Sequence, residues 1–168
     1  EITANEYIAF VLKTNPSANI VIIDLGADQI ASVKKLVRER YSKKKIRVVQ
    51  ANALNLGFLK DHSVDWIDTD GFFSFFDNKQ LGELFTEWKR ILKEDGCITF
   101  RELTSGSLFF TFANHARAYL AKIYMNIPIR LHREKELMDN FVHMKFRFII
   151  GWSPIIILKR YCLVNIRQ

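Results

Sequence analysis

The sequence predicts an α/β fold in which a doubly wound, mostly parallel sheet ends in an antiparallel β-hairpin. Three observations support this prediction. Strand patterns alternate with helix patterns through the first half of the chain, which is the order of a parallel sheet with crossover helices. The apolar run at residues 20–23 is continuous, as in strands that are covered on both faces. Two later β-rich runs flank a turn that contains Gly151 and Pro154.

Residue periodicity places the elements of the first half of the chain. Apolar side chains three and four positions apart predict helices at residues 3–13, 30–41 and 81–92. Short runs rich in Val and Ile predict strands at residues 19–24, 46–50, 63–68 and 97–100. The first helix opens with capping-box spacing between Thr3 and Glu6. Gly96 follows the last helix, where we expect it to supply a left-handed cap.

The last third of the chain departs from this alternation. Apolar and aromatic side chains at helical spacing predict a long helix at residues 108–123 and a shorter one at 134–142. The runs at 146–150 and 155–161 predict the two strands of the hairpin. An α/β sheet that closes on such a hairpin is a specific architecture, and it narrows the choice of fold classes.

Length and composition indicate one globular domain with a basic surface. The chain has 168 residues, of which 49% are hydrophobic, and a formal net charge of +7. This charge favours anionic partners such as nucleic acid, acidic membranes or phosphorylated small molecules. A basic run at 43–45 lies near Arg38, Arg40 and Arg47. The run is either a solvated helix end and loop or a nucleic-acid patch, and the sequence leaves both interpretations open.

The cysteines and the lengths of the apolar runs bear on location. Cys97 and Cys162 are far apart and form no C-x-x-C pair, which is typical of reduced thiols and not of a disulfide scaffold or a zinc site. We therefore expect no bound metal and a cytoplasmic location. No apolar run reaches the roughly 18 residues of a membrane span, so we expect no transmembrane segment.

Three predicted strand ends carry polar residues suited to a nucleoside. The first strand ends in Asp24, the second leads into Ala51-Asn52-Ala53, and the third is followed by a loop that contains Asp70. In this order and spacing the chain resembles the class I S-adenosylmethionine-dependent methyltransferase family, read from its second strand onward. The resemblance covers most of residues 1–100, and the C-terminal hairpin agrees with it in architecture.

The resemblance implies a role for each of these residues. Asp24 would accept hydrogen bonds from both ribose hydroxyls of S-adenosylmethionine, and Leu25 would lie against its adenine. Asn52, followed by Ala53, stands where the family has an acid, and its carbonyl oxygen can still accept a bond from the adenine amino group. Asp70 would lie near the cofactor and the substrate. Asn52 and Asp70 are also ordinary turn formers, and this simpler interpretation stays open.

The glycine-rich loop that follows the first strand in this family has no counterpart in the chain, because the helix at 3–13 corresponds to the helix after that loop. In the family the first strand lies between the second and the fourth, so its absence would leave two strand edges with unpaired backbone groups. We therefore expect residues 1–168 to be a single, N-terminally incomplete domain whose natural upstream residues supply the strand. The alternatives are a strand from another chain or direct pairing of 21–24 with 65–68. We expect the chain by itself to bind the cofactor poorly.

The function that the resemblance implies is methyl transfer from S-adenosylmethionine to a small, partly apolar molecule. Such a displacement depends mainly on alignment, and we assign no catalytic base. A group of phenylalanines could either line the substrate pocket or belong to the hydrophobic core. They are Phe72, Phe73, Phe75, Phe76, Phe109, Phe110 and Phe112. Alternatives are an RNA methyltransferase, an inactive methyltransferase-like binding or assembly subunit, and another nucleotide-dependent α/β enzyme such as a dehydrogenase, against which the hairpin argues.

Overall fold

The computed structural model describes residues 4–102 continuously and shorter pieces beyond them. These pieces are residues 104–105, 115–116, 119–120, 122–123, 130, 132–133, 135, 137, 139, 146–151 and 159–165. The chain forms two compact units, Glu1–Leu56 and Gly57–Gln168. None of the described helices is both long and apolar enough to cross a membrane.

The first unit is a two-stranded parallel sheet with two helices. Its elements are α1 (Ala4–Thr14), β1 (Ile20–Asp24), α2 (Ala27–Arg40) and β2 (Ile46–Gln50). The register runs from Ile20 opposite Ile46 to Asp24 opposite Gln50, so both strands end at one edge. The hydroxyl of Tyr41 donates a 2.9 Å hydrogen bond to Asn5, which joins the end of α2 to the start of α1.

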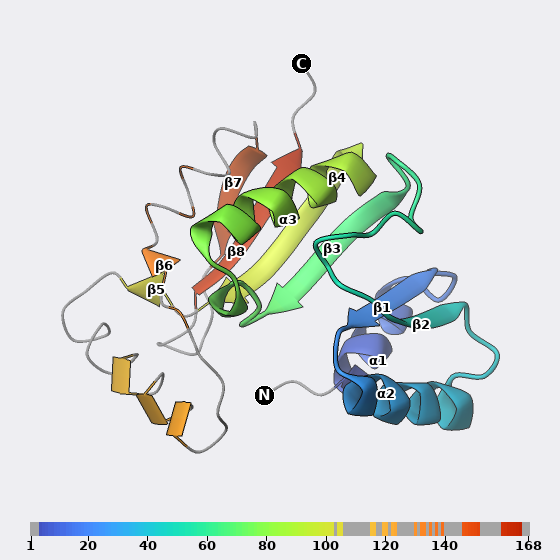
Figure 1. Cartoon of the computed structure of the whole chain (residues 1–168). Coiled ribbons are helices and arrows are strands. Elements are labelled where there is room, and N and C mark those ends of the chain that lie inside the picture. The colour runs from blue at the N-terminus through green and yellow to red at the C-terminus, as the bar shows by residue number, and fades with distance from the viewer. Residues whose placement is uncertain are drawn as a thin grey trace. The chain divides into compact units, whose positions relative to one another are not determined.

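The second unit is built on a four-stranded sheet with the order β3-β4-β8-β7. Its elements are β3 (Val64–Asp70), the 3-10 turn η1 (Phe73–Phe75), α3 (Asn78–Ile91), β4 (Leu92–Glu102), β5 (Thr104–Ser105), β6 (His132–Arg133), β7 (Phe146–Gly151) and β8 (Lys159–Asn165). β3 and β4 are parallel, and β8 is antiparallel to both of its neighbours. In Figure 1, α3 crosses one face of this sheet.

The core of the second unit lies between α3 and the sheet. Leu81, Leu84 and Phe85 of α3 are at most 1% exposed, and so are Phe73 and Ile98 opposite them. Aromatic rings fill the centre, because the ring of Phe73 packs edge-on against that of Phe85 with centroids 5.2 Å apart. Burial of such large apolar side chains is the main stabilising contribution in this unit.

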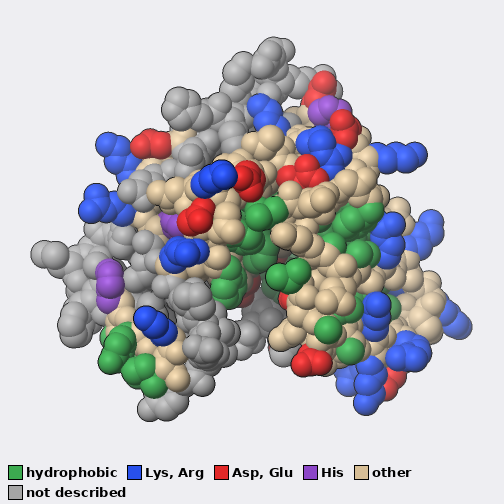
Figure 2. Space-filling view, in the orientation of Figure 1, with side chains coloured by type: hydrophobic (Ala, Val, Ile, Leu, Met, Phe, Trp, Pro, Cys, Tyr) green, Lys and Arg blue, Asp and Glu red, His purple; other side chains and the backbone are tan. Residues whose placement is uncertain are grey.

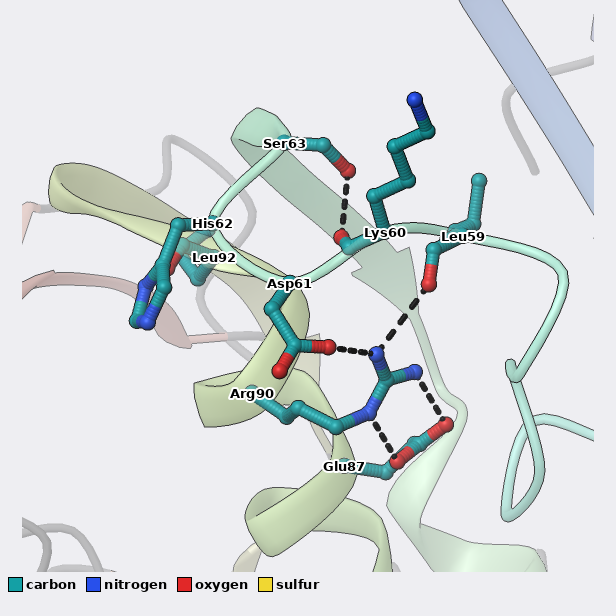
Figure 3. A network of polar contacts seen from close by, with 8 residues as sticks. All are labelled: Leu59, Lys60, Asp61, His62, Ser63, Glu87, Arg90 and Leu92. Carbon is teal, nitrogen blue, oxygen red and sulfur yellow. Dashed lines mark hydrogen bonds and ion pairs between the residues drawn. The ribbon is translucent and has the colours of Figure 1, made fainter.

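A polar network ties the end of α3 to the loop before β3 (Figure 3). The guanidinium of Arg90 donates two hydrogen bonds to Glu87, of 2.9 and 2.7 Å, and one of 3.1 Å to the carbonyl of Leu59. It also pairs with Asp61. The hydrogen bonds to Glu87 have the largest effect and that to Asp61 the next, and both raise the pKa of Arg90 above its ordinary range. His62 lies in the same loop and has a φ of 48°. It precedes the amino end of β3, so the length of this strand separates it from the carboxyl end of β3.

The structure confirms the predicted alternation of helices and strands and the predicted antiparallel hairpin. The first two strands and the first three helices lie within a few residues of their expected positions. β7 pairs with β8, although the described second strand lies at Lys159–Asn165, further along the chain than the predicted 155–161. Thr3 and most of the two helices predicted at 108–123 and 134–142 lie outside the described residues.

The prediction of a glycine cap at Gly96 is wrong. α3 ends at Ile91, and Leu92 already has an extended backbone with ψ of 136°, so Gly96 lies inside β4. A Cβ atom at Gly96 would lie 2.7 Å from Cγ of Leu92 and 3.1 Å from the carbonyl oxygen of Asp65. Glycine is therefore required here for space and not for a left-handed turn.

The extent of β3 and the exposure of β1 correct two further expectations. β3 extends to Asp70, so this residue ends a strand and does not lie in the following loop. Among the described strands, β1 pairs with β2 and β3 pairs with β4, in separate sheets. The alternative of direct pairing between 21–24 and 65–68 concerns strands of the two separate units and stays a prediction. Val21 is 38% exposed, so the apolar run of β1 is not covered on both faces.

Candidate functional site

The carboxyl end of β1 presents an exposed carboxylate. Asp24 is the last residue of β1, and its Oδ1 accepts a 2.7 Å hydrogen bond from the backbone N–H of Gly26. This bond turns the chain from the strand toward α2, which begins at Ala27. The rest of the Asp24 side chain faces solvent. A carboxylate that is oriented by one bond and otherwise open can accept further hydrogen bonds from the hydroxyls of a ligand.

Leu25 and Gly26 form the turn beside this carboxylate. Leu25 is 69% exposed, which is unusual for a large apolar side chain and leaves a flat surface open to a ligand. The side chain of Gln50 donates a 3.0 Å hydrogen bond to the carbonyl of Leu25 and so holds the turn against β2. A Cβ atom at Gly26 would lie 3.2 Å from Oδ1 of Asp24 and would displace Gln29. Glycine thus keeps the backbone close to the carboxylate.

Asn52 lies at the same edge of the first unit as Asp24. The backbone N–H of Ala51 donates a 3.0 Å hydrogen bond to the carbonyl of Asp24, so the two strand ends are neighbours. Oδ1 of Asn52 accepts a 3.0 Å hydrogen bond from the N–H of Leu54, which is the turn-forming role that the sequence left open. An amide oxygen has a second lone pair, and Asn52 is exposed, so a ligand contact remains compatible with this turn. Ala53 lies within the turn and is half-buried.

Asp70 ends β3 in the second unit, where it is paired with Arg101. Nε of Arg101 donates a 3.1 Å hydrogen bond to Oδ1 of Asp70, and the second guanidinium nitrogen pairs with Oδ2. Arg101 is 7% exposed, and a cation at this depth needs a partner to offset its lost hydration. Asp70 therefore neutralises Arg101 in this structure, and its contact with a cofactor stays a prediction.

Gly71 turns the chain away from the end of β3. Its N–H donates a 2.8 Å hydrogen bond to the carbonyl of Arg101, and its φ is +62°, a conformation that favours glycine. No atom of the described chain lies within 4 Å of the place that a Cβ atom would take. The backbone at the end of β3 is therefore held by β4 while its outer side is open.

The residues after Gly71, Phe72–Phe76, form a tight segment that we call the Phe turn. Glu102, the last residue of β4, accepts a 2.6 Å hydrogen bond from the N–H of Phe73 on one oxygen. Its other oxygen accepts a 3.2 Å hydrogen bond from the hydroxyl of Ser74. Glu102 is 1% exposed and Ser74 is 3% exposed. The carboxyl group is thus enclosed by the Phe turn that it bonds.

The Phe turn is also bonded from β6 and from the residues that precede β6. Nε2 of His132 lies 3.1 Å from the carbonyl oxygen of Phe73 and 3.0 Å from that of Phe76. Carbonyl oxygens only accept, so this nitrogen carries a proton and donates to them. The backbone N–H of Arg130 donates a 2.9 Å hydrogen bond to the carbonyl of Ser74. Segments far apart in the sequence therefore converge on one turn at the carboxyl end of β3.

Burial changes the acidity of the carboxyl group in this cluster. Loss of hydration raises the pKa of Glu102 from the ordinary 4.5 to about 7, and the hydrogen bonds from Phe73 and Ser74 oppose the rise. The negative charge of Asp70 adds to the increase in this pKa. Glu102 therefore titrates near neutral pH, because its buried environment raises its pKa above that of an ordinary carboxyl group.

The phenylalanines proposed for pocket or core divide between these roles. Phe73 is fully buried at 0% exposure and belongs to the core. Phe75 is 49% exposed, which leaves its ring available to a ligand. Phe72 and Phe76 are half-buried, with ring centroids 4.9 Å apart. Phe109, Phe110 and Phe112 lie outside the described residues.

Sequence reasoning missed the residues that surround the Phe turn. Glu102 and Arg101 follow the apolar run Ile98–Phe100 in the sequence, so the signal that singled out Asp24, a charge at a strand end, was present. His132 is one of four histidines in the sequence. Its bonds to Phe73 and Phe76 depend on tertiary structure, and no local pattern predicts them.

The model of a family described as a methyltransferase domain matches residues 5–96, which is more than half of the chain. This match runs from the first unit into the second. No curated protein matches the chain in sequence.

Solved methyltransferase structures share the fold at low sequence identity. A SAM-dependent methyltransferase from Methanosarcina mazei has a TM-score of 0.71 and 16% identity, over 97% of this chain and 89% of that one. An O-methyltransferase family protein from Burkholderia thailandensis has a TM-score of 0.79 and 15% identity over 98% of this chain, which spans only 48% of that protein. Geranyl diphosphate C-methyltransferase from Streptomyces coelicolor, solved with S-adenosyl-L-homocysteine, has a TM-score of 0.71 and 13% identity, over 97% and 70%. The chain therefore belongs to the methyltransferase-domain family, and its fold is that of class I S-adenosylmethionine-dependent methyltransferases.

Proposed function

We propose that the protein transfers a methyl group from S-adenosylmethionine to a small, partly apolar molecule. The observation that carries this proposal is the exposed Asp24 carboxylate at the carboxyl end of β1, oriented by its bond from Gly26. In open α/β sheets ligands bind beyond the carboxyl ends of the strands, and an acid at this place binds the ribose of a nucleotide. Membership of the methyltransferase-domain family supports the reaction.

The residues at the end of β1 and β2 fit the adenosine part of the cofactor. Asp24 would accept hydrogen bonds from the ribose hydroxyls, and the exposed side chain of Leu25 would cover one face of the adenine. Asn52 would accept a bond from the adenine amino group on its second lone pair, next to Ala53. The cofactor supplies the methyl group on a sulfonium centre. The contribution of the protein is to hold the adenosine in one orientation.

The proposed acceptor is small and partly apolar because of the rings at the Phe turn. Phe75 is 49% exposed, while Phe72 and Phe76 are half-buried beside it. An aromatic surface that faces solvent binds apolar or aromatic groups. Among the proteins with this fold, the Streptomyces coelicolor enzyme is named for geranyl diphosphate, which has an apolar chain. We place Asp70 and Gly71, which precede the Phe turn, near the reacting groups.

Calorimetric titration of the natural full-length protein with S-adenosylhomocysteine tests the proposal. We expect binding, and we expect Asp24→Ala to weaken it by about 1.5–3 kcal/mol, the range for hydrogen bonds to a charged group. Asp95→Ala is the matched control, because Asp95 is also exposed but lies in the first part of β4, toward the amino end of that strand. Equal affinity of the wild type and Asp24→Ala would remove Asp24 from the site. Absence of binding in the wild type would overturn the proposed cofactor.

A second candidate is a binding or assembly subunit that has lost catalysis. Two contacts favour it. Oδ1 of Asn52 is already engaged by the N–H of Leu54, and Asp70 is paired with the buried Arg101. The candidates differ in a simple way, because such a subunit would bind partners in the absence of S-adenosylmethionine and would transfer no methyl group.

A third candidate is methylation of RNA, favoured by a strongly basic surface on the first unit. Between residues 34 and 47 there are eight basic side chains and one acidic side chain. All eight are exposed, and we call them the basic surface: Lys34, Lys35, Arg38, Arg40, Lys43, Lys44, Lys45 and Arg47. Figure 2 shows Lys and Arg side chains gathered over α2 and the turn that follows it. A dense group of exposed cations suits the phosphate backbone of a nucleic acid.

We further propose that residues 1–168 belong to one methyltransferase domain and that the protein works in the cytoplasm. The family match supports the first point, because it continues across the boundary at Leu56 between the two units. The wide separation of Cys97 and Cys162 in the sequence, without a C-x-x-C pair, supports the second. Cell fractionation with an antibody against the natural protein tests the location.

A further inference from the structure

A buried carboxyl group that the proposed adenosine contacts do not use joins the Phe turn to the end of β4. Glu102 is 1% exposed, and its oxygens accept hydrogen bonds from the N–H of Phe73 and the hydroxyl of Ser74. These partners lie 29 and 28 positions away in the sequence. A carboxyl group enclosed by a turn cannot keep both bonds if the turn moves away. The position of the Phe turn is therefore linked to Glu102.

Other charged and titratable groups hold the same region from neighbouring elements. Arg101 of β4 pairs with Asp70 of β3, and its carbonyl accepts the N–H of Gly71. His132 of β6 donates to the carbonyls of Phe73 and Phe76. The turn is thus fixed through its donors by Glu102 and through its acceptors by His132.

The charge state of Glu102 affects this arrangement. Burial raises the pKa of Glu102 to about 7, whereas a turn that opened to water would return the group to its ordinary 4.5. The closed turn therefore binds the proton more tightly than the open turn, and linkage favours closure while Glu102 is protonated. As the pH rises from 4.5 to about 7, opening of the Phe turn becomes easier.

We propose that Glu102 is a positioning residue, whose carboxyl group holds the Phe turn in the conformation that cofactor binding requires. The proposal rests on the proposed function. The Phe turn follows β3 directly, and the carboxyl ends of strands are where open α/β sheets bind ligands. Between the strand and the turn lies Gly71, with open space at its outer side. Movement of the turn would therefore displace Asp70 and Gly71, the residues that the proposed function assigns to the reacting groups.

Titration of the natural full-length protein with S-adenosylhomocysteine at pH 6 and pH 8 tests the proposal. For the wild type we expect affinity to fall by about tenfold between these values, one decade for the one pH unit between pH 6 and the titration midpoint near 7. Glu102→Gln imitates the protonated group, because its amide oxygen can still accept the N–H of Phe73. We expect this variant to keep the affinity of the wild type at pH 6 at both pH values. Glu102→Ala, which has no acceptor, should bind about tenfold more weakly at pH 6.

The matched control is Glu83→Gln, the same chemical change on the exposed side of α3. It should follow the wild type at both pH values. If Glu102→Gln retained the pH dependence of the wild type, the effect would come from another group such as His132, and the proposal would be overturned. A flat wild-type profile would overturn it as well. If Glu102→Ala does not fold, the comparison of the wild type with Glu102→Gln decides alone.

Failure of this proposal is distinguishable from failure of the proposed function. A wild type that does not bind S-adenosylhomocysteine at either pH contradicts the proposed function. Amide hydrogen exchange of Phe73, measured by NMR, then tests the hold of Glu102 on the turn without a cofactor. Amide exchange is base-catalysed, so the protection factor of Phe73 is compared and not the rate. A lower protection factor at pH 8 than at pH 6 in the wild type but not in Glu102→Gln supports the hold, and identical protection factors in the two proteins overturn it.

Discussion

At the residue scale, Gly96 and Gly82 differ in the space around their Cα atoms. Gly96 lies in β4, where an added methyl group would meet Leu92 at 2.7 Å and the backbone oxygen of Asp65 at 3.1 Å. The side chain of Leu92 is fully buried and the oxygen belongs to a paired strand, so neither can move easily. Gly82 lies in α3, and no atom of the described chain is within 4 Å of its added methyl group.

This difference predicts opposite effects of the same substitution. Gly96→Ala should lower the free energy of unfolding by about 1–3 kcal/mol, since an overpacked site must distort its neighbours. Gly82→Ala should raise it by about 0.5–1 kcal/mol, because alanine restricts the unfolded chain and favours a helix. Urea denaturation of both variants measures the two changes. Equal and small effects would show that Gly96 is not packed against Leu92 and Asp65 as described.

At the element scale, the pair of β3 and β4 has one apolar face and one polar face. Ile98 and Phe100 of β4 are buried beneath α3. The alternate residues bond across the strands, because Thr99 donates to Asp68 and Trp66 donates to Thr99 at 2.7 Å. The Arg101 pair with Asp70 continues this row toward the carboxyl end. These cross-strand bonds fix the register of β3 against β4 up to the Phe turn.

The second element-scale feature is the basic surface, which lies at the amino end of β2 and along α2. Asp24 and Asn52 lie at the carboxyl ends of β1 and β2, so the basic surface occupies the other end of that sheet. RNA held there would contact the first unit away from the proposed adenosine contacts. The surface would thus dock a substrate and would not hold the reacting group.

Charge reversal tests this docking surface. Changing Lys43, Lys44 and Lys45 to Glu should weaken the salt dependence of single-stranded RNA binding. The slope of log K against log salt should become smaller by about 2, because each phosphate that is no longer neutralised accounts for about 0.7 of the slope. Reversal of the exposed Lys13, Lys60 and Lys79 gives the same change in net charge elsewhere and should leave more of the slope intact. Fluorescence anisotropy of a labelled oligonucleotide measures both slopes. Equal reductions would indicate only nonspecific attraction, and binding to anionic vesicles instead would indicate a membrane.

At the scale of the whole molecule, buried Glu102 links stability to pH. Its pKa in the folded protein is about 7, above the ordinary 4.5, so between these values the folded state holds a proton that the unfolded state has released. Its contribution to the free energy of unfolding therefore falls as the pH rises from 4.5 to 7 and is constant above. At 1.36 kcal/mol for each pKa unit, the fall is about 3 kcal/mol.

Glu102→Gln should remove this fall and be more stable than the wild type at pH 8. Chemical denaturation of the two proteins at pH 5, 6, 7 and 8 measures it. The gap between the two curves should narrow from pH 8 toward pH 5, which is the internal control, because Glu102 loses its effect on the free energy of unfolding as the pH approaches 4.5. Parallel curves through the whole range would contradict a buried carboxyl group at this place.

The order of elements, the hairpin and the strand-end position of Asp24 could be predicted from the sequence because each depends on local patterns. Helical spacing in α3 and β-branched runs in β1 and β2 record which side chains share a face. Boundaries that depend on packing could not be predicted in the same way, and Gly96 shows why. Its glycine signal is the same for a helix cap and for a crowded strand, and only the positions of Leu92 and Asp65 distinguish them.

The sequence by itself determined the family, the alternation of helices and strands, and an acid at the end of β1. Only the tertiary structure decided that Glu102 is enclosed by the Phe turn and that Asp70 neutralises Arg101. These contacts join residues 29 and 31 positions apart. The energy of a charged group depends on its hydration and its partners, which exist only after the chain has brought distant segments together.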